Sequence, residues 1–533
     1  MNRFLRGFWG GRLQSAPMLR PALRFAVLGL VLASAGRGAI VLAPLFQDHA
    51  VLQCEMPVPV WGQADPGEVV TVKFAGQSVR TTARTDGHWL ARLAPLAAST
   101  QPAELVVTGK DTVRVADILV GEVWLCSGQS NMEFPVHDPA IAYFRLDQAA
   151  AEVAAANHPL IRQFKVARKV AESPVGTVQG DWAVCSPATV GAFTAVGYFF
   201  ARDLSARLGV PVGIINSTWG GTPVESWMSA EALASDPAFK VVDERWRKML
   251  AEYPAKKAAY DEASGAWQKA EAAARAGGAE ASAAFLRENH RPRPPRGPGD
   301  SWTPGGLYNG MIAPLAPAAF RGVLWYQGES NAERAAEYRA LFSAMITQWR
   351  RTWSRGDFPF YFVQLANYRV PSDATGQTYA FLREAQAQTL ALPATGMAVT
   401  IDIGDPDNIH PGNKQEVGRR LAQMAAAQTY GQGGEFSGPV FASATREGAT
   451  WRVKFTHADG LGARGGPIKG FTLAGIDRVF HPADARIEGD SLILSAAAVP
   501  EPVAVRYAWA NAPVATLGNA AGLPAAPFRT DTW

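Results

Sequence analysis

"VWLCSGQSNMEF", residues 123–134, joins an apolar run to a short stretch of small and polar residues. The apolar residues 118–126 predict a buried strand, and the residues from Ser127 to Asn131 end it abruptly. Such a break suits an ordinary turn. It also suits a serine, Ser130, held at the end of a strand as a nucleophile. What lies at the ends of the other strands decides between these interpretations.

Strand and helix patterns alternate through the middle of the chain. Continuous apolar runs without strict alternation suit parallel strands that are buried on both faces. These runs lie at 118–126, 210–216, 321–327, 358–365 and 396–403. Helical patterns fall between them, at about 192–208, 332–353, 376–392 and 414–428. This order predicts an open α/β sheet in a domain that spans residues 113–434.

The two flanks of this domain have a different pattern. Residues 36–112 and 435–533 alternate apolar and polar residues between turn signals, which predicts antiparallel, sandwich-like or jelly-roll-like accessory segments. They could pair into one sandwich or stand separately. Within the central domain, residues 235–300 are rich in alanine, charge and then proline. This insertion could be a lid or cleft wall, or a surface excursion.

The first 35 residues resemble an export signal. A basic start precedes the short apolar run 25–35, which ends in the small residues Ala33-Ser34-Ala35. We expect cleavage after Ala35 and a periplasmic or secreted protein with no membrane contact afterwards; a retained anchor is the alternative. The formal charge of +4 depends on five arginines in this segment, and without it 46 basic residues face 47 acidic ones. No basic patch therefore indicates nucleic acid.

Cysteine usage indicates neither a disulfide framework nor a metal site. Cys54, Cys126 and Cys185 are an odd number at wide spacings, and no zinc-ligand pattern surrounds them. No His-Glu-x-x-His string occurs either, which argues against a metallohydrolase. We expect no metal and no cofactor.

Chemistry-bearing residues follow four of the five predicted strands. Ser130 comes first, then Gly220, then Asn331, and finally Asp407 with His410. Ligands of open α/β sheets bind beyond the carboxyl ends of the strands, so these residues should meet at one edge. They are the types that acyl transfer needs: a nucleophile, a base with a carboxylate partner, and donors for an oxyanion.

His410 is the best candidate for the base. Of the eight histidines, it alone follows a core-like strand and precedes a helix inside the α/β region. Asn413 and Glu416 form a predicted capping pair for that helix, which anchors the loop. Asp407 lies three residues upstream, so one loop could present both side chains.

Four motifs carry a resemblance to a known family. "GQSNM", "WGGTPVESW", "WYQGESNA" and "NIHPGNKQEVGRRLA" together resemble the SGNH (GDSL-like) hydrolases, and more narrowly their sialate O-acetylesterase-type carbohydrate esterases, over roughly residues 113–430. The resemblance implies a flavodoxin-like three-layer fold. It implies Ser130 as nucleophile, His410 as base and Asp407 as its orienter. The oxyanion hole would comprise the N–H groups of Ser130 and Gly220 and the side chain of Asn331.

Two details of the resemblance stay open. Gly221 could replace Gly220 in the oxyanion hole, although Gly220 is preferred because it stands two residues before Thr222. The superfamily's Gly-Asp-Ser-Leu string is replaced by Gly-Gln-Ser-Asn at 128–131. The resemblance implies removal of O-acetyl groups from sugars, either sialic acids or plant cell-wall oligosaccharides such as xylan and xyloglucan. Candidate substrate contacts are Gln129, Trp219, Glu329 and Arg383, with Trp227, Trp325, Gln327 and Asn309 as further polar or stacking residues. Burial with hydrogen bonds to loops is the alternative for Gln129, Glu329, Gln327 and Arg383, and a place in the core is the alternative for Trp325.

Other functional classes remain as alternatives. A carbohydrate-binding or adhesion protein on an inactive scaffold should lack Ser130, Asp407 or His410, but all three are present. A lipase should carry a Gly-x-Ser-x-Gly elbow, which is missing around Ser130. The sequence indicates neither the particular acetylated sugar nor the oligomeric state.

Overall fold

The computed structural model describes residues 39–533, and a largely parallel sheet carries the candidate site. The predicted signal segment, 1–35, lies outside the described residues. The strand order is β10 (Gly180–Cys185), β9 (His158–Val166), β11 (Val212–Thr218), β8 (Thr112–Gly128), β12 (Gly322–Tyr326), β13 (Phe360–Val363) and β14 (Thr395–Ala398). All neighbours pair in parallel except β10, which is antiparallel to β9. The predicted α/β sheet is confirmed.

Two strands of this sheet escaped the sequence prediction. β9 and β10 contain polar residues such as Arg162 and Gln163, which interrupt the apolar run expected of a buried strand. Arg162 is buried because its guanidinium binds the carbonyl and the carboxylate of Asp117. The last predicted strand was too long, since β14 ends at Ala398 and residues 399–403 form turns.

Helices cover both faces of the sheet. The four long ones lie close to the predicted ranges: α3 (Ala195–Leu208), α7 (Ala335–Trp353), α8 (Thr378–Gln388) and α9 (Lys414–Gln428). Trp124 of β8 packs on Phe200 of α3, whereas Trp325 of β12 packs on Phe342 of α7. Trp325 lies opposite Ser127, three residues after Trp124, so these two tryptophans point to opposite faces. α9 packs beside α3, and α8 packs beside α7.

Short helical turns connect these elements. They are α1 (Ser130–Glu133), α2 (Ala149–Ala155), η1 (Val190–Ala192), η2 (Val224–Trp227), α4 (Ala230–Ala234), η3 (Pro237–Phe239), η4 (Tyr308–Ile312), η5 (Ala313–Leu315), η6 (Glu329–Arg334) and η7 (Thr389–Ala391). Three of them, α1, η2 and η6, begin within a few residues of a strand's carboxyl end. They therefore bring polar side chains to the edge where a ligand of an α/β sheet binds.

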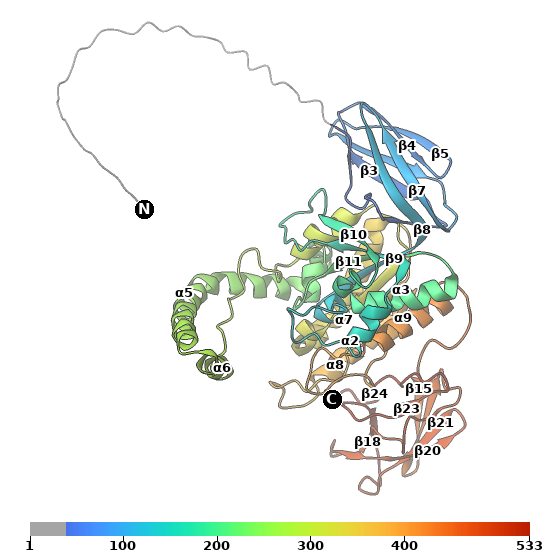
Figure 1. Cartoon of the computed structure of the whole chain (residues 1–533). Helices are drawn as coiled ribbons and strands as arrows, with labels where there is room; N and C mark the ends of the chain where they lie inside the picture. The colour runs from blue at the N-terminus through green and yellow to red at the C-terminus, as the bar shows by residue number, and fades with distance from the viewer. Residues whose placement is uncertain (1–38) are drawn as a thin grey trace, which may run out of the picture. The chain divides into compact units, whose positions relative to one another are not determined.

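The amino-terminal flank is antiparallel β structure, apart from the parallel pairing of β2 with β8, and it shares a strand with the central sheet. It contains β1 (Val41–Leu42), β2 (Val51–Gln53), β3 (Val58–Gln63), β4 (Val69–Phe74), β5 (Gln77–Thr82), β6 (His88–Leu93) and β7 (Ser99–Thr108). The first part of β8 pairs with β7, and its second part pairs with β11 and β12 (Figure 1). The expected boundary at residue 113 therefore falls inside a continuous strand.

The carboxy-terminal flank forms its own sheets. Its strands are β15 (Val440–Glu447), β16 (Thr450–Thr456), β17 (Gly462–Ala463), β18 (Phe471–Ala474), β19 (Phe480–Pro482), β20 (Asp484–Glu488), β21 (Ser491–Ser495), β22 (Ala504–Tyr507), β23 (Leu517–Gly518) and β24 (Phe528–Arg529). The sheets β15-β16-β21-β20 and β19-β18-β22-β24 meet through the stacked rings of Phe441 and Phe528. In residues 39–533, no strand pair joins this flank to the amino-terminal one, so the flanks do not form one sandwich.

The insertion is a pair of exposed helices, α5 (Lys240–Ala276) and α6 (Ala279–Glu288), which lie side by side (Figure 1). Arg245, near its start, pairs with Glu225 of η2. Trp302, just after it, donates a 2.7 Å hydrogen bond to the carbonyl of Gly221. Both ends of the insertion therefore contact the segment that follows β11. Within residues 39–533, no helix combines the length and apolarity that crossing a bilayer requires.

Candidate active site

Ser130 lies directly beyond the carboxyl end of β8, as the first residue of α1. A Cβ atom at Gly128 would come within 2.2 Å of the carbonyl oxygen of Tyr326, and the Gly128 φ is +132°. Only glycine tolerates both conditions, so the chain can turn sharply out of the sheet here. Because Ser130 opens a helix, its N–H has no intrahelical acceptor and is available to an anion.

His410 lies next to this serine in space, although it is 280 residues later in the sequence. Its Nε2 lies 2.8 Å from Oγ of Ser130. The ring packs edge-on against Phe144, with centroids 4.9 Å apart, and lies 5.4 Å from Tyr143. Burial lowers the pKa of His410 to about 4, and the positive charge of Lys414 contributes. The imidazole is thus neutral at neutral pH, and with its proton on Nδ1 it can accept the serine proton.

The loop before α9 holds His410 through its own side chains. The N–H of His410 donates to Oδ1 of Asn408 at 2.9 Å, and the N–H of Asp407 donates to Oδ1 of Asp405 at 2.9 Å. Asn413 caps α9 by accepting from the N–H of Glu416. The predicted cap is therefore confirmed at Asn413, whereas the carboxylate of Glu416 binds arginines instead.

Asp407 is not brought onto His410 in this structure. Its carboxylate lies 2.8 Å from a guanidinium nitrogen of Arg369, and the two side chains are 76% and 67% exposed. Within residues 39–533 no hydrogen bond joins Asp407 to His410. Asp407 and His410 are three residues apart in one loop. Because no contact joins them here, the role of Asp407 as the orienting acid stays a prediction.

Gly220 lies beside Ser130, whereas Gly221 faces open space. A Cβ atom on Gly220 would lie 3.2 Å from Cβ of Ser130 and 3.1 Å from Oε2 of Glu133, but one on Gly221 would meet nothing within 4 Å. The N–H of Gly220 donates to Oε2 of Glu133 at 2.8 Å. This donor is well placed for an oxyanion, but a carboxylate already occupies it.

Asn331 is committed to protein groups at both ends of its amide. Its Nδ2 donates to Glu225 at 2.8 Å, and its Oδ1 accepts from the N–H of Val224 and from Gln327. The side chain is fully buried. The proposed donation to an oxyanion is not seen in this structure, because the carboxylate of Glu225 takes the amide nitrogen.

Comparisons with known proteins show the family to which this chain belongs. A family model described as "Carbohydrate esterase, sialic acid-specific acetylesterase" matches residues 298–428. The sialate O-acetylesterase of Rattus norvegicus is 32% identical over 468 residues, which is 79% of this chain and 80% of that protein. This chain belongs to the sialate O-acetylesterase family. The Mus musculus enzyme is 29% identical over 565 residues, covering 96% of this chain and 98% of its own.

A solved structure supports the same assignment. The crystal structure of a carbohydrate acetylesterase from Xanthomonas citri is 40% identical, with a TM-score of 0.77, and covers 93% of this chain and 100% of its own. The resemblance found in the sequence motifs is therefore confirmed. As a member of the sialate O-acetylesterase family, the protein is a carbohydrate O-acetylesterase that acts on an acetylated sugar.

Two of the predicted substrate contacts in this esterase are structural residues. Arg383 is fully buried, and its guanidinium donates to four backbone carbonyls, those of Leu365, Ala366, Ala510 and Asn511. It joins α8 to the carboxy-terminal flank, and these contacts fit the burial alternative for Arg383 and not a substrate contact. Gln129 is 3% exposed, and its Oε1 faces the N–H groups of Gly328 and Ser330. Trp227, Trp325, Gln327 and Asn309 are likewise buried.

Trp219 precedes Gly220, and Glu329 binds the side chain of Asn131, so both lie near Ser130. The guanidinium of Arg168 lies 5.4 Å above the Trp219 ring and also binds the carboxylate of Glu133. Oε1 of Glu329 accepts from Asn131 at 2.6 Å, and burial raises the pKa of this carboxyl. The sequence analysis missed Glu133 and Arg168. Glu133 shares a helical face with Ser130 at a spacing of three, which is a usable signal, whereas Arg168 follows the unpredicted β9.

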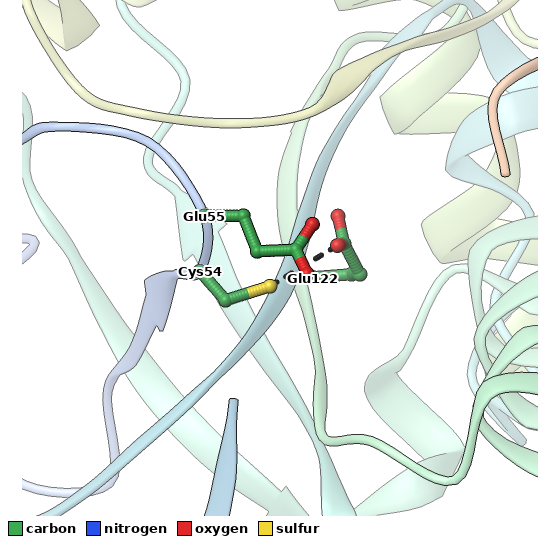
Figure 2. A group of neighbouring side chains, drawn as sticks. All are labelled: Cys54, Glu55 and Glu122. Carbon is green, nitrogen blue, oxygen red and sulfur yellow. Dashed lines mark hydrogen bonds between the residues drawn. The ribbon is translucent and has the colours of Figure 1, made fainter. Parts of the chain in front are cut away.

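One cluster of potential metal ligands lies beside the interior of β8, where side chains of Cys54, Glu55 and Glu122 converge (Figure 2). Both carboxylate oxygens of Glu122 already bind Arg321, at 2.8 and 2.7 Å. Burial raises the pKa of Cys54 to about 12, so its thiol stays protonated and donates to Glu122. Metal binding needs a thiolate and a free carboxylate, so this donor set does not fit an ion.

Proposed function

We propose that this esterase deacetylates sugars through an acetyl-enzyme on Ser130, with His410 as general base. The observation that carries the proposal is the 2.8 Å separation between Nε2 of His410 and Oγ of Ser130. The Ser130 oxygen attacks the acetyl carbonyl while its proton moves to Nε2. The ester C–O bond then breaks, and the imidazolium returns the proton to the sugar oxygen. Water repeats the sequence and releases acetate.

The developing oxyanion would be held by backbone donors. We assign the N–H of Ser130 and that of Gly220, which lies against Ser130. Glu133 must then turn away from Gly220, because a carboxylate and an oxyanion cannot share one donor. Arg168 already binds the other oxygen of Glu133 and is a ready partner for the displaced carboxylate. Asp407 would leave Arg369 and bind Nδ1 of His410, which stabilises the imidazolium.

The sugar would lie over Trp219, the half-buried tryptophan beside the nucleophile. Aromatic faces of this kind can stack on a sugar ring. An acidic sugar such as an acetylated sialic acid needs a cation, and Arg168, with a 49% exposed side chain, replaces Arg383 as the candidate. A neutral acetylated xylan or xyloglucan oligosaccharide has no carboxylate for Arg168 to bind, so Arg168 would act there only through Glu133. We also propose export, supported by the composition of residues 1–35.

The test is acetate release from acetylated sialic acid, acetylated xylan and acetylated xyloglucan oligosaccharides. Arg168→Ala should lose more activity on the sialic acid than on the neutral substrates if the carboxylate of that sugar binds there, because any effect through Glu133 falls on all three substrates alike. Hydrolysis of a phospholipid, with no acetate released from any of the three sugars, would refute the carbohydrate assignment. N-terminal sequencing of the exported protein checks cleavage after Ala35.

A further inference from the structure

The backbone on both sides of His410 is held by buried side chains. The carbonyl of Ile409 accepts from Nδ2 of Asn131 at 2.9 Å. The carbonyl of Pro411 accepts from Nζ of Lys414 at 2.8 Å. Asn131 follows Ser130 directly in the short helix α1. The same helix therefore carries the proposed nucleophile and a side chain that binds the backbone of the His410 loop.

These two side chains belong to one hydrogen-bonded network. Nζ of Lys414 donates to Oδ1 of Asn131 at 2.7 Å, and Nδ2 of Asn131 donates to Oε1 of Glu329 at 2.6 Å. Asn131 is 2% exposed and Lys414 is not exposed at all. The network therefore spans the ends of β8 and β12 and the start of α9, which are the elements that must stay in register for the site to form.

The Lys414 ammonium is an unusual group to bury in this place. It lies 4.7 Å from the ring centroid of Phe134 and 5.5 Å from that of Tyr326. A buried cation is costly unless it is paired and hydrogen-bonded, and aromatic faces stabilise it further. Acyl transfer by Ser130 and His410 does not itself require a lysine at this site.

We propose that Asn131 and Lys414, anchored by Glu329, are positioning residues that hold His410 against Ser130 through the backbone on both sides of it. This inference rests on the roles proposed above for Ser130 and His410. The network acts on the backbone around His410, and Asp407 would act on its Nδ1, so the two contributions are separate. Misplacement of a catalytic group by about 1 Å can cost on the order of a hundredfold in rate.

The charge of Lys414 also opposes protonation of His410, and the groups around the two side chains contribute to this effect. His410 faces Ser130 of α1, Tyr143 and Phe144 of the preceding loop, and Lys414 of α9. Lys414 itself faces the carboxyls of Glu329 and Asp147.

Burial lowers the pKa of Lys414 to about 7, while both carboxyls act in the opposite direction. The lysine is therefore charged throughout the acid range in which His410 takes up its proton. Removing that charge should raise the pKa of His410.

The experiment compares Lys414→Met and Asn131→Ser with the wild type in kcat, KM and the pH profile of kcat/KM. Lys414→Met should lower kcat about tenfold with KM changed less than about twofold, and should move the acid limb to higher pH. Asn131→Ser cannot reach Ile409, so kcat should fall similarly, but the acid limb should stay in place because Lys414 remains.

A matched control is Arg350→Met, which removes another buried cation that binds backbone carbonyls. Arg350 donates to the carbonyls of Phe358 and Pro393, at the amino ends of β13 and β14 and so at the opposite edge of the sheet. Arg350→Met should lower the melting temperature without moving the acid limb.

A folded Lys414→Met enzyme with the wild-type kcat and acid limb would overturn the proposed positioning role of the network. If Lys414→Met does not fold, wild-type kcat in Asn131→Ser overturns it. Loss of acetate release in Ser130→Ala is checked separately, because retained activity there refutes the proposed function instead.

Discussion

Nε2 of His410 lies 2.8 Å from Oγ of Ser130, although 280 positions of sequence separate the two residues. The contact exists because β8 ends at Gly128 and α9 begins at Lys414, each at the same edge of a parallel sheet. A hydroxyl beside a neutral, half-buried imidazole is the arrangement that a serine esterase needs before its substrate arrives. This contact predicts a distinct effect on activity for each substitution at the site.

Ser130→Ala should abolish acetate release while the protein stays folded. Removing the nucleophile of such a site costs several orders of magnitude in kcat, on the order of 10⁴ or more. The hydroxyl contributes little to stability, so the melting temperature should change by no more than a few degrees. Turnover above about a tenth of the wild-type value would contradict the assignment of Ser130.

The activity should persist into acid further than an ordinary histidine base allows. Burial and the Lys414 charge lower the pKa of His410 to about 4, so the imidazole takes up its proton only below about pH 4. A protonated His410 cannot accept the proton of Ser130, and kcat/KM should therefore be flat to about pH 5 and fall below that. An acid limb near pH 6.5, the value of an unperturbed histidine, would show that the base is exposed or different.

Asp407→Asn should reduce kcat, but less than His410→Ala does. A carboxylate orients and stabilises the imidazolium, whereas the imidazole itself moves the proton. We expect a loss of about ten- to a hundredfold in kcat for Asp407→Asn. Arg369→Ala, which only frees the Asp407 carboxylate from its exposed ion pair, should keep at least wild-type kcat. Full activity in Asp407→Asn would show that the carboxylate plays no part.

Arg383→Ala should damage stability and leave sugar preference unchanged. The guanidinium donates to four carbonyls that are buried or half-buried, and its removal takes away one donor from each of them. A loss of about 3 kcal/mol in the free energy of unfolding is expected, measured by denaturant titration. KM values on acidic and neutral acetylated sugars should match those of the wild type. A selective loss on one sugar would return Arg383 to the substrate site.

Chelators should not inhibit the esterase. The Ser130 and His410 chemistry needs no Lewis acid, and the Cys54, Glu55 and Glu122 cluster is committed to Arg321 and to a protonated thiol. Incubation with a divalent-metal chelator, followed by assay, should give unchanged kcat. Inhibition that is reversed by adding one particular divalent ion would contradict this.

The sequence by itself determined the elements that local pattern specifies. Continuous apolar runs identified β8, β11, β12 and β13 because parallel strands covered on both faces have no polar side. Ser130 and His410 could be named because each stands in a small polar motif directly after such a run. β9 escaped because Arg162 and Gln163 are buried there by partners elsewhere in the chain.

Only the tertiary structure decided what each polar side chain meets. Arg383 reads as a cleft residue in sequence, but the carbonyls it binds lie as far away as Asn511. The occupation of Gly220 by Glu133, the pairing of Asp407 with Arg369 and the grip of Asn131 and Lys414 on the His410 loop depend on side-chain directions across distant segments. Hydrogen bonds are short and directional, and no local pattern encodes partners that, in these three cases, lie 87, 38 and 283 residues away.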